Sequence, residues 1–124
     1  MKTVISTQNA PAAIGPYSQA IDLGNMVFVS GQIPVDPATG AVAGETIVEQ
    51  AKQVMANLQV VLAAAGTTPE RAVKTTCFLA DMADFAAFNE IYAQTFMSKP
   101  ARSCVAVRTL PKGVLCEVEV VAEI

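Results

Sequence analysis

The side chains available for chemistry are carboxylates, arginines, lysines, tyrosines, serines and cysteines, because the chain contains no histidine. Without an imidazole, Cys-His and Ser-His nucleophile pairs and most zinc or non-haem iron sites are excluded. The chain has three cysteines, Cys77, Cys104 and Cys116, which lie in apolar segments and show no CxxC spacing. This pattern is typical of reduced thiols in a cytosol-like compartment. We therefore predict that Cys77 and Cys116 are small core residues.

Charged residues near the C-terminus alternate with apolar ones. In the last predicted strand, Glu117 and Glu119 fall on the face opposite the apolar set. In the preceding strand, Ser103, Val105 and Val107 form the apolar set, which leaves Arg102 and Cys104 on the other face. If the two strands pair antiparallel with their apolar sets matched, Arg102 and Cys104 share a face with Glu117 and Glu119. One such register places Cys104 opposite Glu117 and Arg102 opposite Glu119.

The pattern by itself favours an ordinary cross-strand ion pair on a solvated sheet, worth about 0.2–1 kcal/mol, because Arg/Glu ladders are common. Two features weaken this interpretation. The protein carries few charges, and Pro100-Ala101 stiffens the approach of the chain to Arg102.

A second group lies in the N-terminal part, in Gly15-Pro16-Tyr17-Ser18 and Ser30-Gly31-Gln32. A hairpin between these segments would bring a phenol, two hydroxyls and glycine-exposed backbone amides near one another. Turn formation alone would also explain the Gly-Pro and Ser-Gly pairs.

The helices and strands that position these residues can be predicted from turn-forming residues and from the spacing of apolar residues. Thr46-Ile47-Val48-Glu49 is a capping-box pattern, and the apolar positions after it recur at spacings of four and three. We predict strands at 18–23, 26–32, 73–79, 102–108 and 114–124, and helices at 46–65 and 84–96. This order indicates an α+β fold with both helices on one face of the sheet. The other face would need cover, for which another subunit is the natural candidate.

The amino-acid composition also suggests that some apolar surface contacts another subunit. The chain has 124 residues, one domain's worth, of which 52% are hydrophobic and 15% charged, against roughly 25% charged in typical soluble domains. The net charge of −3 and the lack of a basic cluster disfavour nucleic-acid binding. No signal peptide or membrane span is expected, since the best candidate, 47–65, is interrupted by Glu49 and Lys52. We expect a soluble, cytoplasmic protein.

Several motifs together resemble the reactive intermediate deaminases of the RidA or YjgF type. The resemblance runs in order along essentially the whole chain, through the segments 13–20, 24–34, 36–40, 57–66, 78–85, 89–92, 100–103 and 110–111. It implies one RidA-like domain over residues 1–124, with a chorismate-mutase-like α+β fold and a mixed, mostly antiparallel sheet. It further implies a homotrimer whose sheets form a central barrel, with a site at each subunit interface.

The resemblance also implies the reaction. Such proteins hydrolyse 2-enamine or 2-imino acids, such as 2-aminoacrylate (2-iminopropanoate) and 2-iminobutanoate, to 2-oxo acids and ammonia, with no cofactor and no metal. Arg102 matches the arginine that holds the substrate carboxylate, a task suited to a planar guanidinium. Glu117 matches the glutamate that positions or activates the attacking water.

Other positions carry over as site-lining residues. Cys104 is expected to contribute its backbone amide and local shape rather than a nucleophilic thiol. The remaining matches are Tyr17, Ser30, Gly31 and Asn89, with Pro111 in the loop beside the pocket. The connection Thr95–Lys99 departs from the family pattern, which puts the preferred substrate size in question.

Two other functions stay open. One is an endoribonuclease or translation inhibitor, a label that some relatives carry; the acidic balance counts against it. The other is a non-catalytic binding module for small 2-oxo acids that uses the same Arg102. Glu117 discriminates between binder and enzyme, because a carboxylate binder gains nothing from a second negative charge in its pocket.

Overall fold

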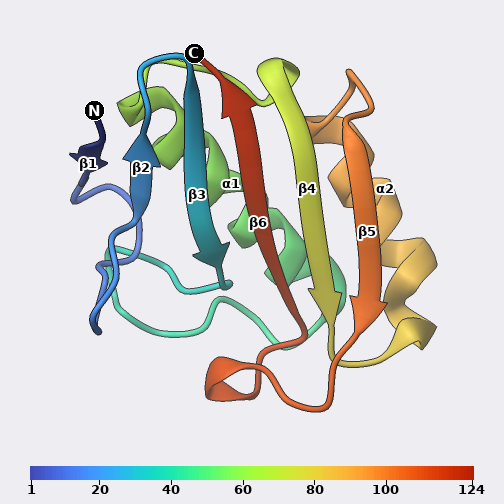
Figure 1. Cartoon of the computed structure of the whole chain (residues 1–124). Coiled ribbons are helices and arrows are strands. Elements are labelled where there is room, and N and C mark those ends of the chain that lie inside the picture. Colours follow the sequence, from blue (N-terminus) through green and yellow to red (C-terminus); the bar gives the residue numbers. More distant parts are fainter.

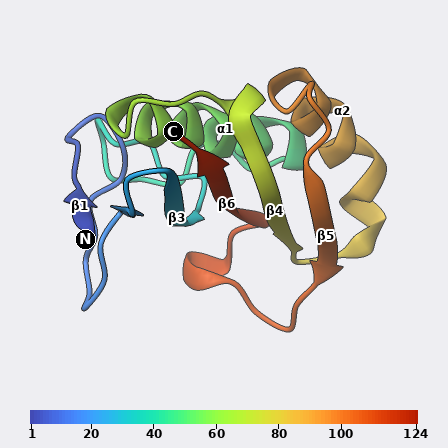
Figure 2. The ribbon, with the colours of Figure 1, turned by 45° about the horizontal axis from the view of Figure 1, so that its top comes forward.

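The computed structural model describes residues 1–124 and contains one six-stranded sheet with two α-helices on one face (Figure 1). The order across the sheet is β1-β2-β3-β6-β4-β5, and only the β4–β5 pair is parallel. The α+β prediction with both helices on one face is confirmed, and Figure 2 shows the helices as one layer. The elements are β1 (Thr3–Ile5), β2 (Ala20–Asp22), β3 (Met26–Gln32), α1 (Ile47–Ala64), β4 (Ala72–Leu79), α2 (Phe85–Thr95), β5 (Ala101–Ala106) and β6 (Cys116–Glu123).

The local predictions are confirmed to within a few residues. β2 and β3 form the expected hairpin, in which Gly24 has a φ of 104°, a conformation that favours glycine. α1 begins at the predicted capping box: Glu49 N–H donates to the Thr46 hydroxyl at 3.2 Å, and the Glu49 carboxylate accepts from the Thr46 N–H at 3.3 Å. The sequence pattern does not predict the short strand β1, because three residues carry too little periodicity to be recognised. Neither helix combines the length and apolar character that a membrane crossing requires.

The predicted pairing of the two C-terminal strands is wrong. β5 pairs in parallel with β4, and β4 pairs antiparallel with β6, so β4 lies between β5 and β6 (Figure 1). The connection from β4 to β5 passes through α2, and such a helical crossover returns the chain parallel to the strand it left. No register therefore places Cys104 opposite Glu117, whose cross-strand neighbour is Phe78.

The predicted shared face is also wrong. Cys77 of β4 is fully buried against the helices and is paired with Cys104 on one side and Val118 on the other. Since paired residues point to the same face, Arg102 and Cys104 face the helix layer, whereas Glu117 and Glu119 face away from it. Hydrophobicity is misleading here because apolar side chains lie on both faces of the sheet, and Val105 lies on the open face, where it is 45% exposed.

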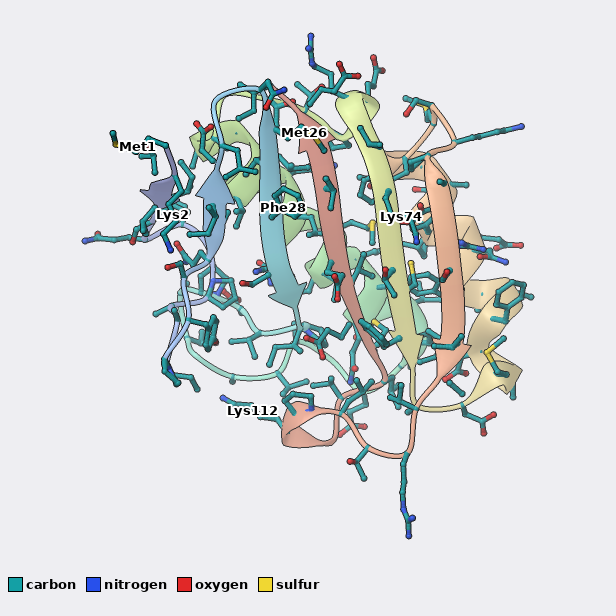
Figure 3. The ribbon with its side chains drawn as sticks, in the orientation of Figure 1. Met1, Lys2, Met26, Phe28, Lys74 and Lys112 are labelled. Atoms are coloured by element: carbon teal, nitrogen blue, oxygen red, sulfur yellow. The ribbon has the colours of Figure 1, made fainter.

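That open face carries apolar side chains from five strands, interspersed with charged and polar ones such as Glu119. Figure 3 shows Met26 and Phe28 projecting from it, and Phe28, which pairs with Val121, is 45% exposed. Further members are Ile21, Phe78 and Val105. An apolar sheet face with no helix over it is the kind of surface that a subunit interface covers.

One buried polar residue of α1 fixes the segment that follows β3. Asn57 is 1% exposed, and its Nδ2 donates to the carbonyls of Ile33 at 3.1 Å and Val35 at 3.0 Å. Its Oδ1 accepts from Gln53 Nε2 at 2.9 Å. Every polar atom of this side chain is therefore paired, and the chain after Gln32 is tied to the core.

We expect Asn57→Ala to destabilise the protein by about 2–4 kcal/mol, because two buried carbonyls lose their donor and a cavity opens. Urea unfolding at a fixed protein concentration measures this loss. Gln59→Ala is the matched control on the exposed face of the same helix, with a change below about 0.5 kcal/mol. Equal midpoints for the two variants would contradict the anchoring role of Asn57.

Candidate functional site

Arg102 lies at the edge of the sheet, under α2. Its Nη1 donates to Asn89 Oδ1 at 2.8 Å, and its guanidinium carbon lies 4.7 Å from the Tyr92 ring centroid and 5.6 Å from that of Phe85. These contacts are an amide and two aromatic rings, so none of them neutralises the arginine. Arg102 borders a depression of about 280 Å³ next to α2, and a free positive charge there suits an anionic ligand.

Cys104 is half-buried on the same face as Arg102. Burial raises the pKa of its thiol, although the nearby Arg102 acts in the opposite direction. A thiol with a raised pKa is neutral near neutral pH and a poor nucleophile. Cys77 and Cys116 are completely buried, as predicted, and burial raises the pKa of each to about 12.

The remaining predicted residues, except Asn89, gather around one cavity at the other face of the sheet. This cavity has a volume of about 520 Å³ and is lined by residues of the N-terminal loop, the end of β3, the 110–113 segment and β6. Ser30 Oγ donates to the Ser18 carbonyl at 2.6 Å, so the two ends of the hairpin meet as expected. The predicted members are Tyr17, Ser30, Gly31, Pro111 and Glu117.

Gly31 and Glu117 are in direct contact. The pairing of β3 with β6 is irregular between Val29 and Gln32, and at this point the Glu117 carboxyl group lies against the backbone of Gly31. A Cβ on residue 31 would come within 2.9 Å of Glu117 Cδ and would collide with its Oε2. A side chain at residue 31 would therefore displace the Glu117 carboxyl group from this position.

The pKa of the Glu117 carboxyl group is higher in the folded protein than in water. Burial raises the pKa of this carboxyl group, and the negative charge of Glu119, two residues along the same face, raises it further. Glu119 and Lys112 also line the cavity, and Lys112 has a left-handed backbone with φ of 58°. The cavity thus holds two carboxylates and one amine.

Within one chain, Arg102 and Glu117 do not belong to the same cavity. The structure brings Arg102, Cys104 and Asn89 together under α2, and it brings Glu117 together with Tyr17, Ser30, Gly31 and Pro111 on the opposite face. Two residues of the divergent connection, Phe96 and Lys99, border the Arg102 depression.

Sequence reasoning misses several neighbours of these groups. Tyr92 contacts Arg102, and its spacing of three from Asn89 places both residues on one helix face. Lys112, Ile14 and Ile33 do not stand out in the sequence, because loop residues carry no periodic signal. No group of three or more His, Cys, Asp or Glu side chains is placed to hold a metal ion.

Comparison with known proteins identifies the family. The family model described as Endoribonuclease L-PSP matches residues 7–124. The 2-iminobutanoate/2-iminopropanoate deaminase of Salmonella typhimurium is 52% identical over 126 residues, which cover 98% of each chain.

Two solved structures are similar over almost the full length. The crystal structure of Escherichia coli TdcF with bound serine has a TM-score of 0.94 at 45% identity and covers 98% of each chain. The crystal structure of the E. coli yjgF gene product has a TM-score of 0.93 at 47% identity, again covering 98% of each chain. Both the sequence match and the fold match therefore extend over nearly all of the chain, which belongs to the RidA/YjgF/RutC family.

Proposed function

We propose that this protein hydrolyses 2-enamine and 2-imino acids, such as 2-aminoacrylate and 2-iminobutanoate, to 2-oxo acids and ammonia. The observation that carries the proposal is the Glu117 carboxyl group, held over Gly31 in a cavity with a phenol and a hydroxyl. The name of the Salmonella relative supports the reaction, and the serine bound to E. coli TdcF supports a small amino or imino acid as ligand.

The catalytic unit in this proposal is a homotrimer with a site at each interface. Arg102 and Glu117 of one chain lie on opposite faces of the sheet, so a site that uses both needs two copies of the chain. The open apolar face around Phe28 and Val105 supplies the contact area. The Arg102 edge of one subunit then completes the Glu117 cavity of its neighbour.

The chemistry follows from these groups. Arg102 binds the substrate carboxylate through paired N–H donors and so fixes the iminium carbon in position. Glu117 accepts a proton from a bound water as the water oxygen forms a bond to that carbon, giving a carbinolamine. Glu117 then returns the proton to the amine nitrogen, the carbon–nitrogen bond breaks, and the hydroxyl proton leaves with ammonia as ammonium. The carbonyl of the 2-oxo acid remains.

The raised pKa of Glu117 suits both halves of this cycle, because a carboxyl group poised closer to neutral pH accepts and returns a proton more readily. The base form is the ionised one. Activity should therefore rise with pH through the pKa of Glu117, along a limb that lies above the ordinary carboxyl value of 4.5.

RNA cleavage fits the Glu117 cavity less well. Glu117 and Glu119 outnumber Lys112 there and would repel a phosphate backbone. A small 2-oxo acid binder without activity would use Arg102 but would have no need for Glu117.

The direct test is a coupled assay in which a dehydratase generates 2-aminoacrylate and semicarbazide traps it. The protein should compete with the trap, so that semicarbazone formation falls as protein is added. A parallel incubation with single-stranded RNA should show no salt-dependent cleavage. Equal trapping with and without the protein would contradict the proposed activity.

We expect Arg102→Ala to lose both imine hydrolysis and 2-oxo acid binding, and Glu117→Ala to lose hydrolysis by at least about 100-fold while retaining some binding. Assays with 2-iminobutanoate and calorimetry with 2-oxobutanoate separate the two effects. Arg108→Ala and Glu123→Ala are matched controls, since both residues are exposed outside these cavities. If Glu117→Ala hydrolyses the imine at the wild-type rate, Glu117 does not act as the base.

We further expect Gly31→Ala to lower kcat by about 100-fold, because the added methyl group displaces the Glu117 carboxylate. If Gly31 acts through Glu117, Gly31→Ala should have little additional effect in a Glu117→Gln background. A double-mutant cycle on kcat measures this coupling. Additive losses would show that Gly31 serves another purpose.

A further inference from the structure

Tyr92 links the buried core to the guanidinium of Arg102. The residue is 8% exposed, and its hydroxyl lies 2.7 Å from the hydroxyl of Thr75, which is completely buried. Its ring stacks on Phe96 with centroids 4.8 Å apart and planes inclined by 28°. The Arg102 guanidinium carbon lies 4.7 Å from the Tyr92 centroid. The ring is thus held at its tip by Thr75 and on its plane by Phe96.

The strand register makes this arrangement possible. Thr75 of β4 is the direct neighbour of Arg102 on β5, and paired residues point to the same face. The two side chains therefore both extend toward α2, which presents Tyr92 to them. Asn89, one turn earlier on α2, accepts a hydrogen bond from Arg102 Nη1 at 2.8 Å.

An aromatic partner has a particular consequence for an arginine. A guanidinium has five N–H donors that all lie in its plane, so a ring packed against its face uses none of them. A carboxylate partner would instead occupy an edge and cancel the positive charge. With one donor on Asn89 and its guanidinium carbon 4.7 Å from the Tyr92 centroid, Arg102 keeps donors and charge available to a ligand carboxylate.

We propose that Tyr92 is a positioning residue that fixes the plane of the Arg102 guanidinium, so that its free N–H edge meets the carboxylate of a 2-imino or 2-oxo acid in two-point contact. The inference rests on the proposed function, since it assigns how the carboxylate is bound in that reaction. The Thr75 hydroxyl holds the ring, and Asn89 sets the rotation of the guanidinium within its plane.

A purely structural role would give Tyr92 the same importance as a neighbouring core aromatic of the same helix. Phe88 is completely buried, with its ring centroid 5.9 Å from that of Tyr92, whereas the aromatic contacts of Arg102 are with Tyr92 and Phe85. Phe88 does not border the Arg102 depression. Phe88→Leu therefore disturbs the core without removing the ring beside the guanidinium, and it serves as the matched control.

The test compares Tyr92→Leu, Tyr92→Phe and Phe88→Leu, with KM and kcat for 2-iminobutanoate and Kd for 2-oxobutanoate as readouts. Tyr92→Leu should raise KM and Kd about tenfold and leave kcat within about twofold, because a cation–π contact of this kind is lost. Tyr92→Phe keeps the ring and should stay within about threefold of wild type in KM. Phe88→Leu should lower the unfolding midpoint without changing KM.

Other outcomes would overturn the inference. Equal increases of KM in Tyr92→Leu and Phe88→Leu would assign the effect to packing, and a loss confined to kcat would assign Tyr92 to the chemical step. If Tyr92→Leu does not fold, Tyr92→Met replaces it as the non-aromatic variant with the same expected values. A wild-type protein that neither hydrolyses the imine nor binds 2-oxobutanoate would refute the proposed function itself, and the inference with it.

Discussion

The alternation of side chains across the sheet is the constraint on which the account of this protein depends. Because β4 lies between β5 and β6, its pairings decide which face each functional residue occupies. Arg102 pairs with Thr75, so both side chains point toward the helices. Glu117 pairs with Phe78, so both side chains point toward the open face. A slip of either strand by one residue would bring both groups to the same face, so the separation of cation and carboxylate depends on the register.

Each of the two groups is held by the part of the core next to it. On the helix side, Tyr92 and Asn89 orient Arg102 without neutralising it. On the open side, Gly31 leaves room for the Glu117 carboxylate, and Asn57 ties down the chain that leaves β3. The partial burial that raises the pKa of Glu117 belongs to the same arrangement, since its carboxyl group lies against the backbone of Gly31.

Local features of this fold are predictable from the sequence, and non-local ones are not. The capping box at Thr46 and the glycine turn at Gly24 act within a few residues, so their signals are visible in the sequence. Strand order depends on which distant segments meet, and the apolar Val105 favours a face that it does not take. The family motifs correctly group Tyr17, Ser30 and Gly31 with Glu117, which no periodicity could do. The contact of Tyr92 with Arg102 is not foreseeable, because a buried aromatic on a helix usually signals only packing.

If Arg102 of one subunit works with Glu117 of another, two inactive variants should complement each other within one assembly. Arg102→Ala and Glu117→Ala chains with different tags would be co-expressed, and assemblies that carry both tags isolated at the mass of three 12.9 kDa chains. In a cyclic trimer every mixed assembly contains one interface with an intact arginine and an intact glutamate, so its imine hydrolysis should reach about one third of the wild-type rate. Mixed trimers no more active than either variant alone would contradict the account.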